Sequence, residues 1–321
     1  MNEEMIQKVF SFAADLMTAG VDGPGIEQRL VGRLQLTPES AAQVVTTLFQ
    51  LCKMPPDHVE LCLQALRDKH GLEIGGPSAI FRQNSLLPVY PVMAGVDNCV
   101  FNQSTVWSGQ LQEGRHYVYQ ENKPPGHQYI GEATGLRMIP DARYDGVLSC
   151  HNIEHVANPI QALTEWLRVL KTGGVLLLVA PHKEGTFDHQ RPVTSLEHLI
   201  EDFNRGVGED DLAHLAEILA LHDLARDPAA GDRAQFKQRC ADNVNNRCLH
   251  HHVFVTETVL ALMNHVQLKI MLCDMVVPHY IIVLCQKPAA NTAPDNCHFL
   301  GAGAVFRQRS PFQSDRVLNR H

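Results

Sequence analysis

The chain has 321 residues and a mass of 35.7 kDa, which suits one large α/β domain with attached segments, or two domains. Hydrophobic residues make up 45% and charged residues 19%, and this ordinary globular composition excludes disorder over most of the chain. The formal net charge of −8 excludes a basic surface that would collect nucleic acid or anionic membrane by charge alone. We therefore expect a small-molecule partner, with no nucleic acid and no membrane.

The cysteines and the start of the chain indicate a reducing compartment. The nine cysteines are an odd number without a C-x-x-C pair, which argues against a disulfide framework and against a zinc ribbon. The first residues lack the basic and apolar regions of a secretory signal, and no run approaches the roughly 18 apolar residues of a membrane span. We expect a cytoplasmic protein, and a homo-oligomer is compatible with the sequence.

Residues 1–68 predict an N-terminal helical segment. Thr37 can cap a helix that has Pro38 at its first position, and Pro56 begins another helical stretch. From Gly71 onward, short apolar runs alternate with glycines, prolines and helical stretches. This alternation is typical of a parallel sheet with crossover helices, so we expect the main domain to begin there.

The best-defined unit of the sequence lies between Tyr144 and Pro181. A strand over 144–149 precedes a helix from about Asn158, and a second apolar strand covers 175–180. Asn158 can cap the helix, Pro159 suits its first turn, and Gly173 can adopt the left-handed conformation that ends it. The pattern predicts a βαβ unit with a right-handed crossover.

A polar stretch over about 183–250, rich in histidine and acid, predicts a helical insertion or lid, with a helix beginning at the capping sequence around Thr194. Two apolar strands then follow, over 268–276 and 280–286. Their connection is too short for a crossover, so they must pair antiparallel. Residues 289–321 form a C-terminal tail that we expect to be loosely held.

A strand that leads into a glycine turn is the first candidate for ligand binding. Leu72-Glu73-Ile74 precedes Gly75-Gly76, where the missing Cβ atoms let a ligand approach the backbone. Asp97 follows a further strand-like run, where the second strand of a nucleotide-binding sheet presents an acid to ribose hydroxyls. One carboxylate accepts two hydroxyl donors well.

Several short motifs follow one another along the chain: Leu72-Glu73-Ile74-Gly75-Gly76, Asp97, Glu132-Ala133, Tyr144-Asp145-Gly146-Val147, Ile153-Glu154-His155 and Leu170-Lys171-Thr172-Gly173-Gly174. In their order and spacing, they resemble the successive motifs of class I S-adenosylmethionine-dependent methyltransferases over about residues 69–287. The segment from His182 to Phe254 further resembles a bacterial subgroup sometimes found beside glycosyltransferases. The resemblance implies a Rossmann-like α/β fold, in which a seven-stranded, mostly parallel sheet ends in an antiparallel pair. The methyltransferase domain would cover 69–288.

The family resemblance also implies the cofactor, S-adenosyl-L-methionine, and the residues around it. In this sequence Gly-Gly-Pro-Ser replaces the commoner Gly-x-Gly-x-Gly of the first loop, which leaves open which amides reach the cofactor. The implied positions are Glu73, Gly75 and Gly76 at the methionine part, Asp97 at the ribose, Glu132 and Ala133 at the adenine, and Ser149, Cys150 and His151 beside the transferable methyl group.

Histidines are the candidates for acid–base chemistry. His151 and His182 fall at or near strand carboxyl ends, where such sheets place ligands, and His189 lies in the insertion, so these three are the candidate catalytic residues. We expect His155 to be packed or capping. His182, Asp188 and His189 could hold a divalent metal, although none is expected by default.

These observations predict methyl transfer from S-adenosylmethionine to a small polar metabolite, such as a sugar or natural-product intermediate, with O-methylation favoured. Two alternatives stay open: a metal-assisted methyltransferase that uses the histidine-rich insertion, and a non-catalytic scaffold of the same fold. A nicotinamide-dependent dehydrogenase is disfavoured because the first strand is not followed by G-x-G-x-x-G and because the sheet ends in an antiparallel pair.

Overall fold

The computed structural model describes residues 9, 12, 13, 16, 23–51, 53–107 and 109–316. The expected N-terminal segment 1–68 therefore lies partly outside the described residues. Its described helices are α2 (Gly23–Leu34), α3 (Pro38–Leu51) and α4 (Pro56–Leu66). The last two begin at the prolines that the sequence indicated. The remaining helices are α5 (Pro159–Val169), α6 (Leu196–Arg205), α7 (Leu215–Leu221), α8 (Arg233–Ala241), α9 (Asn243–Asn246), α10 (Thr256–His265), α11 (Phe306–Arg309) and α12 (Gln313–Arg316).

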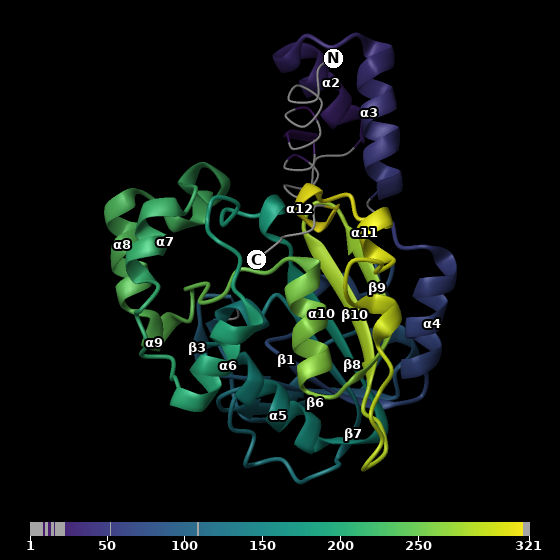
Figure 1. Ribbon diagram of the computed structural model, residues 1–321, viewed down its shortest axis with the longest axis vertical. Helices are drawn as coiled ribbons and strands as arrows, with labels where there is room; N and C mark the ends of the chain where they lie inside the picture. Colours follow the sequence, from purple (N-terminus) through teal and green to yellow (C-terminus); the bar gives the residue numbers. More distant parts are fainter. Residues whose placement is uncertain are drawn as a thin grey trace.

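An eight-stranded sheet in the order β5-β6-β2-β1-β7-β8-β10-β9 forms the centre of the molecule (Figure 1). The strands from β6 to β8 are parallel, and β10 pairs antiparallel with both β8 and β9. The bounds are β1 (His70–Ile74), β2 (Gly95–Val100), β5 (Gly114–Tyr117), β6 (Gly126–Ile130), β7 (Tyr144–Cys150), β8 (Leu170–Pro181), β9 (Lys269–Val276) and β10 (Tyr280–Gln286), with a separate hairpin of β3 (Ser104–Thr105) and β4 (Gly109–Gln110).

The mostly parallel Rossmann-like sheet and its terminal antiparallel pair confirm the predicted fold class. The sheet has eight strands where seven are predicted, and one that the sequence pattern does not indicate is β5, which pairs antiparallel with β6 at the sheet edge. This short strand, Gly-Arg-His-Tyr, buries only Tyr117, so it carries no run of apolar residues that would indicate a strand.

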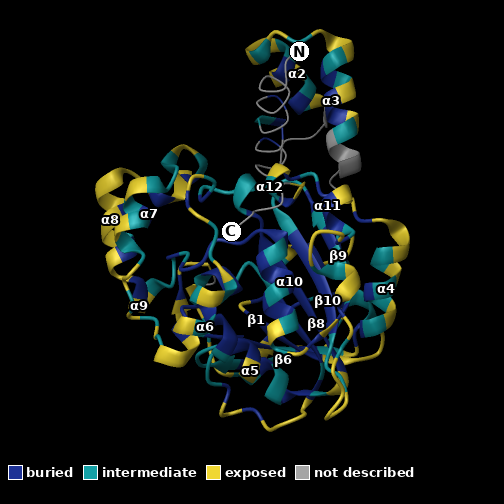
Figure 2. Ribbon diagram, viewed as in Figure 1, coloured by how far each residue is buried: buried dark blue, intermediate teal, exposed yellow. Residues whose placement is uncertain are grey.

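Helices cover both faces of the sheet, and the strands between them are buried (Figures 1 and 2). On one face, α5 and α10 pack their apolar sides against alternate residues of the strands, such as Ile74 and Leu178. On the other face, α4 and the segment around residues 80–93 pack against residues such as Leu148 and Leu177. Because α4 contributes side chains to this core, it packs with the sheet, whereas α2 and α3 form a separate apolar cluster.

The start of α5 forms as its sequence indicated, whereas its end does not. The side chain of Asn158 accepts a hydrogen bond from the Gln161 backbone N–H at 3.0 Å, and Pro159 begins α5. Gly173 has φ of +78° but lies within β8, and α5 ends at Val169 with the extended Leu170 as its cap. Trp166 is buried between α5 and the sheet. The helix that follows the insertion's capping sequence begins at Leu196, with Ser195 rather than Thr194 as its cap.

The described part of the C-terminal tail, residues 289–316, is folded against the body, contrary to the expectation that it is loosely held. Phe306, Ser310 and Phe312 are buried, and Asp315 is almost fully enclosed. Asp315 accepts hydrogen bonds from the Thr256 hydroxyl and from the Ser310 hydroxyl, both at 2.6 Å. These polar contacts fix the tail at the start of α10.

Within the described residues, every helix is too short or too polar to cross a lipid bilayer.

Candidate functional site

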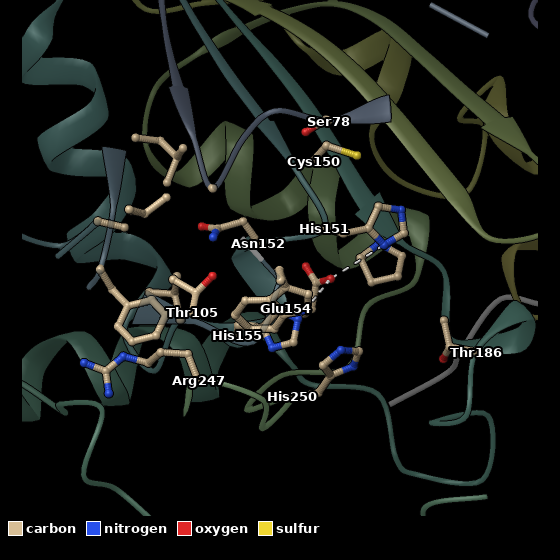
Figure 3. Close-up of a pocket in the computed structure, with 18 of the residues that line it drawn as sticks. Ser78, Thr105, Cys150, His151, Asn152, Glu154, His155, Thr186, Arg247 and His250 are labelled. Atoms are coloured by element: carbon tan, nitrogen blue, oxygen red, sulfur yellow. Dashed lines mark ion pairs between the residues drawn. The ribbon is translucent and has the colours of Figure 1, made fainter. Parts of the chain in front are cut away.

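A cavity of about 820 Å³ opens at the carboxyl ends of the parallel strands. One part of its wall follows β1, β2, β6 and β7, and the facing part comes from the insertion between residues 183 and 250 (Figure 3). β1 lies between β2, which follows it in the chain, and β7, which begins the other half of the sheet. The cavity therefore lies at the topological switch point, where the strand order reverses. Open α/β sheets bind their ligands at this place.

Gly75 forms the part of the wall that follows β1. Its φ is +81°, and its N–H donates to the Cys99 carbonyl oxygen at 2.9 Å, which ties the turn to β2. A Cβ atom at this position would lie 2.9 Å from Nδ2 of Asn152. The glycine therefore provides both the left-handed backbone and the space between two walls of the cavity.

Glu73 and Gly76, predicted beside the methionine part of the cofactor, lie behind this turn and do not line the cavity. The buried Glu73 carboxylate accepts hydrogen bonds from the hydroxyls of Ser78, Tyr90 and Tyr117. Its burial raises the pKa above the ordinary value of a glutamate, although these hydrogen bonds act in the opposite direction. Gly76 donates its N–H to the Asn98 side chain at 2.9 Å. Both residues support the turn from its buried side.

Asp97, predicted beside the ribose, also lies outside the cavity lining. It pairs with Leu72 in the register of β1 and β2, so it precedes the end of its strand, which is at Val100. Its carboxylate accepts hydrogen bonds from the Tyr144 hydroxyl and the His127 N–H, both at 2.7 Å. Phe101 lines the cavity where β2 ends. The sequence indicated the strand but placed its carboxyl end too early.

Glu132 and Ala133, predicted at the adenine, both line the cavity where β6 ends. Oε1 of Glu132 lies 2.5 Å from Nη2 of Arg247, which comes from the insertion. The Arg247 guanidinium also lies 5.0 Å from the centre of the Phe101 ring. This ion pair connects the strand ends to the insertion across one end of the cavity.

Two of the three residues predicted beside the transferable methyl group reach the cavity. Cys150 and His151 line it, whereas Ser149 is fully buried in the strand. Burial raises the pKa of the Cys150 thiol far above its ordinary value, so this cysteine is not a thiolate nucleophile. His151 has φ of +48°, and its Nε2 is buried without a hydrogen bond.

The environment of His151 keeps its imidazole neutral. Burial, and then the nearby His279 and His250, lower its pKa well below the ordinary histidine value. Its Nδ1 lies 3.7 Å from Oε1 of Glu154. A neutral imidazole beside a carboxyl group can accept a proton and keep the resulting cation near a negative charge.

His182 and His189 do not line the cavity. His182 is fully buried, stacks on Phe312 at 3.8 Å between ring centres, and has Nε2 3.3 Å from Oδ1 of Asp315. His189 instead pairs with Asp223 of the insertion at 3.0 Å. These contacts give His182 a role in docking the C-terminal tail and His189 a role within the insertion.

The proposed metal set of His182, Asp188 and His189 does not come together. Asp188 instead contacts Arg191 at 3.0 Å and His250 at 2.5 Å. Among the described residues, two other groups have ligand atoms within 4.8 Å of one another. One contains His198, Asp202, His214 and His252, and the other contains Glu154, His155 and His250.

Glu154, His155 and His250 are the site residues that the sequence analysis missed as functional groups. All three line the cavity, and Figure 3 shows their side chains turned toward one another near His151. Burial raises the pKa of Glu154 to about 7. The motif Glu154-His155 was visible, but nothing in the sequence indicated that His250 would meet it after the long insertion.

One comparison with known proteins gives a family match. Residues 106–178 match the family model described as a methyltransferase domain. A search of curated proteins finds no match.

Solved structures give distant similarities. A Methanosarcina mazei S-adenosylmethionine-dependent methyltransferase is 17% identical, with 74% of this chain and 99% of that chain covered and a TM-score of 0.42. A Mesorhizobium loti methyltransferase is 11% identical, with 72% and 96% covered and a TM-score of 0.42. A chain from the complex of the Haloferax volcanii Trm112 methyltransferase activator with a methyltransferase is 10% identical, with 74% and 89% covered and a TM-score of 0.43.

The family match includes β7, α5 and most of β8, which form the best-defined unit of the sequence, and it also includes cavity residues such as Glu132, Cys150 and His151. The resemblance to methyltransferases is thereby confirmed, while the resemblance to a subgroup found beside glycosyltransferases stays a prediction. Residues 106–178 of the chain therefore match a methyltransferase domain.

Proposed function

We propose that the protein transfers the methyl group of S-adenosylmethionine to a hydroxyl group of a small polar acceptor. The observation that carries the proposal is the arrangement of the cavity, which places the Gly75 turn and a group of partly buried histidines around one space. The volume of about 820 Å³ leaves room for a small acceptor beside a cofactor.

The strand side of the cavity suits the cofactor. The absent Cβ of Gly75 lets a ligand approach the backbone, and Glu132 and Ala133 offer a carboxylate and an amide at the end of β6. Bound S-adenosylmethionine supplies an already activated methyl group on its sulfonium. The residues of this chain then have to hold the acceptor, exclude water and take up its proton.

The insertion side suits a polar acceptor. Thr186, Glu209, Arg226 and His250 line it together with Phe187, so several polar groups converge beside an aromatic ring. His151 is the proposed base. The acceptor oxygen would bond to the methyl carbon as the carbon–sulfur bond breaks, and the hydroxyl proton would pass to the neutral imidazole. Glu154 would stabilise the imidazolium that forms.

The proposal is tested by calorimetry with S-adenosylmethionine, followed by measurement of S-adenosylhomocysteine released across a panel of hydroxylated acceptors. We expect wild type to bind the cofactor and to turn over a subset of the panel. His151→Ala should lower kcat by about 10²–10⁴-fold and leave cofactor affinity within a few-fold of wild type. His116→Ala, exposed on β5 and outside the cavity, is the matched control.

Failure of wild type to bind the cofactor would contradict the proposal. Cofactor binding without turnover on any acceptor would favour the alternative of a non-catalytic scaffold. Equal losses of turnover and cofactor affinity in His151→Ala would assign His151 a structural role.

A further inference from the structure

The group formed by Glu154, His155 and His250 has the composition and position of a metal site that faces the acceptor half of the cavity. Its three side chains each offer one ligand atom, and these atoms lie within 4.8 Å of one another. Glu154 and His155 come from the turn η3 (Ile153–His155), and His250 comes from the segment that returns from the insertion (Figure 3). We propose that these residues bind a divalent first-row transition ion that positions a chelating acceptor.

The Glu154 carboxylate supports this inference because one of its two oxygens is buried without a hydrogen-bond donor among the described residues. The residue is 1% exposed, and its Oε2 makes no hydrogen bond. Its Oε1 lies 3.7 Å from His151 Nδ1 and 4.0 Å from His155 Nε2, which is longer than a hydrogen bond. A buried carboxylate in this situation is costly unless a cation compensates its charge.

The two imidazoles are arranged as metal ligands are. Nδ1 of His250 lies 2.5 Å from Oδ2 of Asp188, whose other oxygen is 3.0 Å from Nη1 of the buried Arg191. A carboxylate on one ring nitrogen fixes the orientation of a histidine and leaves the other nitrogen for a metal. On His155, Nδ1 is buried and makes no hydrogen bond. Two polar atoms of the group therefore have no hydrogen-bond partner among the residues that the structure describes.

The ligand set indicates the class of ion. Two imidazole nitrogens with one carboxylate suit zinc, iron, cobalt or manganese, whereas magnesium prefers an environment of oxygen ligands and water. Three protein ligands that face a cavity leave coordination positions for a further molecule. This feature separates the group from a closed structural site.

The role of the ion in placing an acceptor rests on the proposed function. An acceptor with two adjacent oxygens, such as a vicinal diol or a hydroxy-carbonyl compound, could fill two open positions. Since His151 contacts the same carboxylate, the chelated hydroxyl would lie near the proposed base. The inferred substrate class is therefore a small compound with two adjacent oxygen donors.

The second histidine group, formed by His198, Asp202, His214 and His252, does not line the cavity. It could hold an ion of its own, so the test must separate the two groups. The variant His214→Ala removes one ligand from this second group and leaves Glu154, His155 and His250 in place. It serves as the parent protein for the experiment. Full-length protein without a histidine tag is stripped with a chelator and titrated with Co²⁺ alone, with the visible absorbance as the readout.

We expect the parent to bind Co²⁺ with a visible band, and Glu154→Gln and His250→Gln to abolish that band. Asp188→Asn, which removes the partner of His250, should weaken Co²⁺ binding by about 10–100-fold. Circular dichroism identifies the variants that remain folded. Retention of the parent's spectrum and affinity in any folded Glu154 or His250 variant would overturn the site.

A second arm tests the acceptor class with catechol as a simple vicinal diol. Catechol should shift the Co²⁺ band of the parent, and no shift would overturn the positioning role. Neither readout requires methyl transfer or cofactor, so loss of Co²⁺ binding together with intact cofactor binding would reject this inference and leave the proposed function standing. Co²⁺ binding without binding of the cofactor would reject the proposed function alone.

Discussion

Gly75 holds a backbone conformation at the cavity wall that an L-side chain adopts with difficulty. Its φ of +81° lies in the left-handed region, and its neighbour across the cavity edge is the Asn152 side chain. The turn that it forms is supported from behind by Glu73. At this position, the conformation of one residue determines both the fold of the turn and the shape of the cofactor side of the cavity.

The substitution Gly75→Ala should affect stability and cofactor binding together. The left-handed conformation costs an alanine about 1–2 kcal/mol, and the added Cβ would displace Asn152. We expect a lower free energy of unfolding in urea and weaker S-adenosylmethionine binding by calorimetry. Gly32→Ala in α2 is the control, because nothing lies within 4 Å of the place that its added Cβ would take and alanine favours a helix. Unchanged binding in folded Gly75→Ala would contradict the expectation.

The sequence predicts site residues well where they follow a strand directly, and poorly elsewhere. Gly75, Glu132, Ala133, Cys150 and His151 line the cavity, as strand-end residues should. Glu73 and Ser149 belong to the strands themselves, and successive strand residues face opposite sides of a sheet. Asp97 was misplaced because an apolar pattern indicates a strand more reliably than it indicates the residue where the strand ends.

At the scale of elements, local signals in the sequence explain the helix starts but not the docking of the tail. Asn158 and Ser195 cap their helices as Asn and Ser commonly do, so α5 and α6 could be anticipated. The tail is fixed by a buried polar group instead. Asp315 meets Thr256 and His182, which are distant in sequence, and no local pattern indicates such contacts.

The substitution Asp315→Asn should destabilise the tail by about 1–3 kcal/mol at pH 7, because it removes a charged acceptor from buried donors. Burial opposes ionisation of Asp315, but the hydrogen bond and charge of His182 and the hydroxyl donors lower its pKa below the ordinary 3.8. A lowered pKa contributes stability that is present above the unfolded value and is lost as the pH falls through the folded value.

Urea denaturation of wild type and Asp315→Asn at pH 7, 4.5 and 3 measures this contribution. The difference between them should be largest at pH 7 and should shrink at pH 3. Asp210→Asn, which changes an exposed aspartate of the insertion, is expected to have little effect at any of these pH values. A difference that stays constant with pH would show that the charge of Asp315 contributes nothing.

At the scale of the whole molecule, the antiparallel pairing of the last two strands could be predicted and the path of the insertion could not. The short connection between β9 and β10 requires an antiparallel pair, and the apolar runs supply the parallel strands. The insertion brings His250 to Glu154 and Arg247 to Glu132 through contacts between distant parts of the chain. Polar residues with no helical or strand periodicity give no indication of such contacts.

The ion pair between Arg247 and Glu132 should hold the insertion closed over the cavity. Glu132 is partly exposed, so the pair contributes about 0.5–1 kcal/mol, and the contact of the guanidinium with Phe101 adds a similar amount. Arg247→Gln removes both contributions. A loss of about 1.4 kcal/mol corresponds to a tenfold larger opening constant.

Hydrogen exchange measured by mass spectrometry provides the test of this prediction. In Arg247→Gln, amides of α9 and the adjoining insertion should exchange roughly tenfold faster, while those of β7 and β8 should keep their wild-type rates. Arg205→Gln at the exposed end of α6 removes a positive charge from the same insertion and should leave the rates unchanged. Faster exchange throughout the sheet would mean that Arg247 stabilises the whole fold, and unchanged exchange in the insertion would mean that other contacts close it.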